Sequence, residues 1–146
     1  MFRGNCPTRL DEKGRLKIPA DFKHEIDRNY GCQFYITSRD KKVIELYPLK
    51  EWEQIEERIA KLPSSNQAVR KFMDITSYFG QEVSMDPQGR LTISDRLRGL
   101  FGLKGDVAVV GKLNHMEIRL MDEFTEYVNA SSISDEENDQ LAGMGI

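Results

Sequence analysis

The chain has 146 residues and a net charge of −3, enough for one ordinary hydrophobic core or one core shared by two halves. No apolar run is long enough to span a membrane and the N-terminus has no apolar signal core, so we expect no membrane partner and a cytoplasmic location. The two cysteines, Cys6 and Cys32, have no metal-like spacing and predict neither a disulfide nor a metal site.

The first half contains a short motif, a helix and a pair of extended segments. Residues 11–18, Asp-Glu-Lys-Gly-Arg-Leu-Lys-Ile, join the turn residues Asp and Gly to an apolar strand pattern. Pro19 suits the first turn of the helix that follows, and Gly31 ends that helix. Two runs rich in β-branched and aromatic residues then predict a hairpin over 32–37 and 43–47.

Helical sequence separates the two halves. Pro48 opens a segment whose apolar residues recur at helical spacing as far as Leu62, and Asn66 can cap a second helix that reaches Phe79. We therefore expect a helical hairpin over 48–79. Its apolar stripes predict core packing, and a subunit interface is the alternative, because a small double β unit has little surface to cover them.

The second half repeats the first. Residues 86–93, Asp-Pro-Gln-Gly-Arg-Leu-Thr-Ile, share Asp, Gly, Arg, Leu and Ile with 11–18 at identical spacing. Ser94 is a good N-cap for the next helix, and Gly102 ends it before extended runs at 106–111 and 116–120. Such a repeat in so short a chain predicts two copies of one unit, each a strand, turn, strand, short helix and hairpin.

Charge is distributed unevenly along the chain. Residues 1–20 hold five basic side chains against two acidic ones, and residues 86–104 hold four against two. Residues 117–146 hold eight acidic side chains against one basic, and we expect the polar tail 131–146 to be poorly ordered. The two motifs are thus basic spots on an acidic molecule. This asymmetry favours an anionic ligand on one face, although ordinary solvated turns would also account for it.

The motif combines turn chemistry with an arginine. The Asp side chain accepts from backbone amides ahead of it, and Gly supplies a positive φ. The Arg that follows carries five donors in a fork that suits a phosphate or a guanine edge, and the Asp can orient this fork. In the alternative interpretation Asp and Arg only clamp the turn together, since turns of this composition are common.

These segments resemble the MraZ family of bacterial transcriptional regulators, which are built from two SpoVT-AbrB-type domains. The likeness rests on the opening Met1–Gly4, the two motifs, the link Leu46–Trp52 and the segment Gly102–Val107, and it covers about residues 1 to 128. It implies an α+β fold in which two tandem AbrB-like repeats form one pseudo-two-fold, double-split (swapped-hairpin) β-barrel with peripheral helices. The implied division is a first half at 1–79 (core about 5–47 plus the helical hairpin 48–79), a second half at 80–130 (core about 81–124) and the acidic tail 131–146.

The resemblance also implies a function. Proteins of this family assemble into rings, bind repeated short sites in double-stranded DNA ahead of the division and cell-wall gene cluster, and regulate it, with repression expected here. A nucleoid-associated location follows, with no cofactor and no small-molecule substrate.

The resemblance also assigns site residues. By position the motif residues are Asp11, Arg15, Asp86 and Arg90, with Arg15 favoured as the direct DNA contact. Local charge alone adds Arg3, Arg9, Lys13 and Lys17. In the second motif Pro87 and Gln88 replace Glu12 and Lys13, so the two faces are expected to contribute unequally.

An enzyme is not expected. His24 and His115 are isolated, no glycine loop cradles a phosphate, and no His or Cys pair has zinc spacing. The competing class is a protein-binding module of the AbrB fold, antitoxin-like or a scaffold, with the acidic tail as its partner segment. That tail is expected to lack apolar anchors, and DNA affinity at moderate salt distinguishes the two classes.

Overall fold

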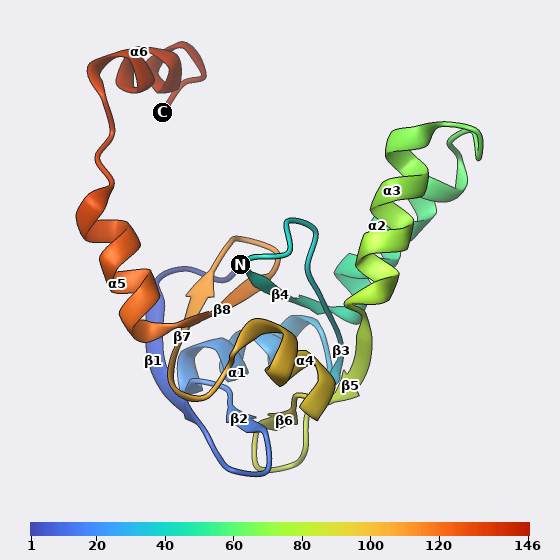
Figure 1. Cartoon of the computed structure of the whole chain (residues 1–146), viewed down its shortest axis with the longest axis vertical. Coiled ribbons are helices and arrows are strands. Elements are labelled where there is room, and N and C mark those ends of the chain that lie inside the picture. The colour runs from blue at the N-terminus through green and yellow to red at the C-terminus, as the bar shows by residue number, and fades with distance from the viewer.

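The computed structural model describes residues 1–146, and its elements follow one order twice (Figure 1). The first unit contains β1 (Asn5–Leu10), β2 (Arg15–Lys17), α1 (Ala20–Asn29), β3 (Gln33–Thr37) and β4 (Ile44–Pro48). The second contains β5 (Gln81–Ser84), β6 (Arg90–Thr92), α4 (Asp95–Phe101), β7 (Gly105–Gly111) and β8 (Met116–Leu120). The predicted order of strand, turn, strand, short helix and hairpin is confirmed in both halves.

Four further helices lie outside the repeated units. They are α2 (Leu49–Ala60), α3 (Gln67–Tyr78), α5 (Met121–Ala130) and α6 (Asp135–Gly143). Two predicted N-caps are confirmed, because the Asn66 side chain accepts from backbone N–H groups at the start of α3 and the Ser94 side chain accepts from the Leu97 N–H. None of the helices is both long and apolar enough to cross a membrane.

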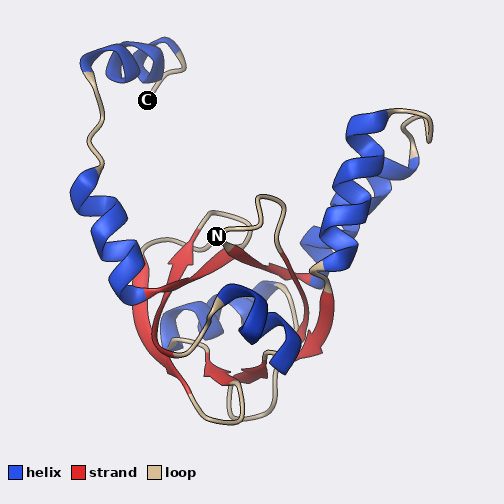
Figure 2. Cartoon of the chain, viewed as in Figure 1, coloured by secondary structure: helices blue, strands red, loops and turns tan.

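The eight strands form one antiparallel sheet in which the two halves exchange strands. The order is β5-β3-β4-β8-β7-β1-β2-β6, so β1 pairs with β7 of the second half and β5 pairs with β3 of the first. Equivalent strands lie on either side of the central β4–β8 pair. The sheet curls into a nearly closed barrel, and in the view of Figure 2 the short helices α1 and α4 lie across the middle of the ring of strands. The predicted pseudo-two-fold, swapped-hairpin barrel is therefore confirmed, and its halves share one core.

The core is built from equivalent residues of the two halves. Leu16 and Leu91, from the two motifs, are fully buried, and they pack in one cluster with Phe22 of α1 and Leu97 of α4. Burial of these two leucines decides the orientation of β2 and β6. Because side chains alternate along a strand, the residues on either side of each leucine must face outward.

The helical hairpin of α2 and α3 projects from the barrel (Figure 1) and is attached at its base by aromatic stacking. The ring of Trp52 stacks on Tyr35 of β3 and on Phe72 of α3, with centroid distances of 4.8 and 6.1 Å. Leu62, at the outer end, and Met73, next to the stack, are 50% and 49% exposed. The base of the hairpin is thus packed on the barrel, as predicted, whereas the hairpin also leaves apolar side chains uncovered.

The acidic tail differs from the expectation of poor order. The Ser134 side chain accepts from the backbone N–H of Glu137, and the Glu137 carboxylate accepts from the Ser134 N–H, so a capping box begins helix α6. The polar composition predicted disorder because it offers little apolar surface to bury, whereas these local hydrogen bonds favour a helix. Every residue of α6 except Leu141 is nevertheless exposed.

Candidate nucleic-acid interface

Each repeated motif forms a tight turn that holds an arginine. In the first turn the Asp11 carboxylate accepts the backbone N–H groups of Lys13 and Arg15, at 3.0 and 2.8 Å. Its second oxygen accepts from the Nε of Arg15 at 2.6 Å. Gly14 adopts the positive φ of +81° that the turn requires. One carboxylate therefore fixes both the turn and the side chain that leaves it.

The second turn has the same geometry. Asp86 accepts the backbone N–H groups of Gln88 and Arg90, and the Nε of Arg90, each at 2.9 Å. In both turns the hydrogen bond from the backbone N–H of the arginine, assisted by the arginine side chain, holds the pKa of the aspartate below its ordinary value. Both aspartates therefore keep their charge to a lower pH than an ordinary aspartate does.

The two turns lie side by side because β2 pairs with β6. The register is Arg15↔Thr92, Leu16↔Leu91 and Lys17↔Arg90. Beyond this pair the Ile18 N–H donates to the Gly89 carbonyl at 2.9 Å, and the Ile93 N–H donates to the Gly14 carbonyl at 2.8 Å. The cross-half pairing therefore joins two distant segments of the sequence into one surface, at the lower end of the barrel in Figure 1.

The outer side of the β2–β6 ribbon carries the arginines. Since the two motif leucines face the core, the side chains of their neighbours point away from it, namely Arg15, Lys17, Arg90 and Thr92. The side chains of Arg15 and Arg90 are 33% and 31% exposed. Their Nε atoms bind aspartate, and their Nη groups have no hydrogen-bond partner within the protein. The aspartate thus clamps the turn and still leaves most of the fork free to bind.

Two basic residues of the short helices join this surface, and the motif analysis missed them as site residues. The Nε of Arg98, in α4, donates to the Ile93 carbonyl at 3.1 Å, and its guanidinium packs against Gly14 of the first turn. Lys23, in α1, packs against Gly89 of the second turn. Each helix therefore covers the turn of the other half. The sequence does contain a signal for these two residues, because Lys23 and Arg98 stand at equivalent positions of the two repeated units.

Three of the residues chosen from local charge lie near the turns. Lys13 is in the first turn, and the Nζ of Lys17 reaches the Gln88 carbonyl of the second turn. Arg9, near the end of β1, lines a groove of about 480 Å³ beside the first turn, together with Arg98. Arg9 and Lys13 thus extend the basic surface beside the first turn, and Lys17 extends it beside the second.

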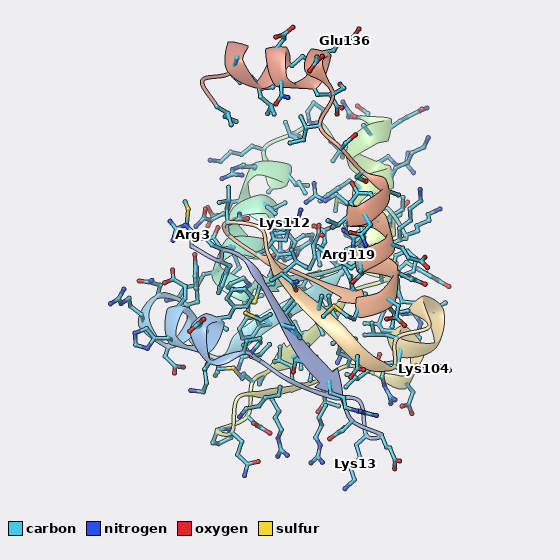
Figure 3. The ribbon with its side chains drawn as sticks, turned by 90° about the vertical axis from the view of Figure 1, so that its left-hand side faces the viewer. Arg3, Lys13, Lys104, Lys112, Arg119 and Glu136 are labelled. Atoms are coloured by element: carbon cyan, nitrogen blue, oxygen red, sulfur yellow. The ribbon has the colours of Figure 1, made fainter.

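The fourth such residue, Arg3, lies elsewhere. It precedes β1, whereas the first turn follows β1, and its backbone lies against Gly111 at the far end of β7. Figure 3 shows Arg3 and Lys13 well apart, with the length of β1 between them. Arg3 is close to the motif in the sequence, but the extended strand β1 separates the two in space.

The fold and this site define a class of protein, the single-chain barrel of two swapped repeats that presents a pair of arginine turns on one face. The chain matches the family described as "MraZ protein, putative antitoxin-like" over residues 1–75 and 80–142. It is 47% identical to the transcriptional regulator MraZ of Acidobacterium capsulatum and 44% identical to that of Koribacter versatilis, over the full length of both chains in each case. The chain belongs to the MraZ family.

Proposed function

We propose that this protein is a transcriptional regulator that binds double-stranded DNA through the two arginine turns. The observation that carries the proposal is the pair of aspartate-held arginines with free Nη groups on one exposed ribbon. A guanidinium fork matches the O6 and N7 acceptors of guanine and the oxygens of a phosphate. Because the fork is already oriented, little conformational entropy is lost when it binds.

The shape of the ribbon supports the same proposal. Arg15 and Arg90 are diagonal neighbours across β2 and β6, which places their Cα atoms about 7–8 Å apart. A two-stranded ribbon fits the major groove of B-DNA, where base edges are distinguishable. In this arrangement the arginines read bases, and the surrounding lysines bind phosphates and fix the register.

The two halves contribute unequally in this proposal. Lys13 of the first turn corresponds to Gln88 of the second. The neutral Gln88 offers no attraction to phosphate, so the first turn binds more strongly than the second.

A single surface of this size binds DNA weakly, and we propose that assembly supplies the remaining affinity and specificity. A ring of copies on regularly repeated promoter sites converts later contacts into intramolecular ones, with a gain of about 10²–10⁴ where the geometry matches. The name of the relatives, transcriptional regulator, supports a regulatory role. We propose that this role is repression of the division and cell-wall gene cluster, by a cytoplasmic, nucleoid-associated protein that needs no cofactor and is not an enzyme.

The test is fluorescence anisotropy with DNA from upstream of the protein's own gene and a scrambled duplex, across a salt series. We expect specific binding that falls steeply with salt, because phosphate contacts release counterions. Arg15→Ala should abolish specific binding, Arg90→Ala should weaken it less, and Arg15→Lys should fail to restore it because a lysine lacks the fork. Arg3→Ala removes the same charge far from the turns and is the matched control.

Two results would contradict the proposal. Loss of the thermal unfolding transition in Arg15→Ala would show that the arginine only clamps its turn. No preference for the upstream DNA at any salt would favour the alternative, a protein-binding module of antitoxin or scaffold type. The feature in favour of that alternative is helix α6, which is capped but exposed.

A further inference from the structure

Helix α6 has hydrogen-bonded caps at both ends, but it does not pack against another element of its own chain. No side-chain hydrogen bond or ion pair joins it to another element. An isolated helix shorter than about 12 residues is marginal in water and gains most of its stability from packing. Since α6 has 9 residues, packing against another surface would supply most of its stability.

The end of α6 is closed by backbone hydrogen bonds. The Ile146 N–H donates to the Leu141 carbonyl at 3.0 Å and the Gly145 N–H donates to the Ala142 carbonyl at 3.1 Å, with Gly145 at a φ of +85°. This is a Schellman motif, which brings the residue after the glycine against the last turn of the helix. We expected the tail to lack apolar anchors, but the chain reversal at Gly145 returns the backbone of Ile146 to Leu141, so two apolar residues lie at the end of α6.

The tail also has a uniform charge. Residues 131–146 contain four acidic side chains and no basic one. Besides the pair at the end of α6, Ile133 and Met144 are exposed, at 62% and 68%. A surface that covers the tail must therefore offer both positive charge and apolar contact.

The outer end of the helical hairpin, which we call the hairpin tip and define as residues 58–71, has these properties. It contains Arg58, Lys61, Arg70 and Lys71 and no acidic residue. The exposed apolar side chain of Leu62 lies on it, and that of Met73 lies next to its inner end. A groove of about 200 Å³ between α2 and α3 extends from the base of the hairpin, at Tyr35 and Trp52, to Ile59 at the inner end of the tip. It is lined mainly by apolar side chains, with Glu56 as its one acidic residue.

The tail does not reach the hairpin tip of its own chain. Helix α5 is held on the barrel by Arg119, whose guanidinium lies over the rings of Phe124 and Tyr127 at 4.7 and 4.9 Å. The link 131–134 has four residues and spans at most about 14 Å. Figure 1 shows α6 and the hairpin on opposite sides of the barrel.

We propose that the tail of one copy binds the hairpin tip of a second copy, with Leu141 and Ile146 in the groove and the acidic first turn of α6 near Arg70 and Lys71. The two surfaces differ, so the contact is head to tail, and such contacts close into a ring when the rotation between copies permits. The inference rests on the assembly proposed above and names the surfaces that make it.

The test is a charge exchange followed by sedimentation velocity of the full chain. The tail variant Glu136→Lys with Asp139→Lys and the tip variant Arg70→Glu with Lys71→Glu each place like charges together. Each should raise the protein concentration at half-assembly by about tenfold or more. The two pairs combined in one chain should restore assembly. Lys42→Glu with Lys50→Glu, exposed positions outside the tip, is the matched control and should assemble normally.

Three outcomes would overturn this proposal: a monomeric wild-type protein, normal assembly of both reversed variants, or reversed variants that the combination does not rescue. If removal of 131–146 leaves assembly intact but raises affinity for random DNA, the tail covers the arginine turns instead. Circular dichroism verifies that each variant is folded. Anisotropy on a duplex with one site measures the arginine turns separately, so a failure of DNA binding is distinguishable from a failure of this contact.

Discussion

The aspartate of each motif combines two roles that the sequence presented as alternatives. Asp11 uses one oxygen for the backbone N–H groups of the turn and the other for the Nε of Arg15. Because the two contacts use different oxygens, the clamp and the orienting interaction coexist. The same division recurs at Asp86 and Arg90. The motif could be predicted to bind an anion, but only the geometry shows which donors remain free.

The pKa of the motif carboxylates provides a direct test of this geometry. We expect Asp11 and Asp86 to titrate below their ordinary value of 3.8. Their contribution to stability is present above the pKa of the unfolded chain and is lost as the pH falls through the lower folded value. In Arg15→Ala the pKa of Asp11 should rise only part of the way, because the backbone N–H of residue 15 remains. Carboxyl NMR titration measures these midpoints, and a midpoint at or above 3.8 for wild-type Asp11 would contradict the hydrogen-bonded turn.

The two turn glycines should differ in their tolerance of a side chain. A Cβ at Gly14 lies 2.6 Å from the Ile93 carbonyl oxygen, whereas at Gly89 the nearest atoms, at 3.1 Å, belong to the flexible side chain of Lys23. Positive φ alone costs about 1–2 kcal/mol for alanine. Gly89→Ala should lower the free energy of unfolding by about that amount, and Gly14→Ala by clearly more. Urea denaturation with comparison of m-values measures both, and equal losses would show that the ribbon adjusts around Gly14.

At the scale of the element, local patterns predicted the strands and short helices but not their partners. Each of these signals involves residues only a few positions apart. They are the turn residues, the N-caps Asn66 and Ser94 and the alternating apolar runs. The exchange of strands between halves, and the crossed packing of Lys23 and Arg98, depend on contacts between distant segments that no local pattern encodes. At α6 two signals conflict, because the Ser134 and Glu137 capping box favours a helix whereas the polar composition predicts disorder.

The aromatic stack should determine how firmly the helical hairpin is attached. Trp52 is the single tryptophan and lies between Tyr35 and Phe72, so its fluorescence reports on the base of the hairpin. Phe72→Ala removes one face of the stack and should lower the free energy of unfolding by about 2 kcal/mol, with a red shift of the emission. Met73→Ala, on the same helix but outside the stack, is the control. An unchanged emission maximum in Phe72→Ala would mean that Trp52 is held by the barrel alone.

At the scale of the whole molecule, the pseudo-two-fold barrel places two similar but unequal turns on one face. Since β2 and β6 come from different halves, this face exists only when the barrel is complete. The hairpin and the tail project from other parts of the barrel, away from the turns (Figure 1). This separation leaves the DNA surface free when copies associate, so an assembled ring can present several pairs of turns at once.

The decisive prediction for the assembly concerns the number and spacing of DNA sites. On a duplex with one site, wild type and the tip variant Arg70→Glu with Lys71→Glu should bind equally, because neither residue lies at the turns. On a duplex with repeated sites, wild type should gain about 10²–10⁴ in affinity and the tip variant should gain little. Insertion of about half a helical turn, roughly 5 base pairs, between sites should reduce the wild-type gain, because the next site then faces away from the ring. Anisotropy on the three duplexes measures these affinities. A gain that survives in the tip variant would show that copies on neighbouring sites act without contact between hairpin and tail.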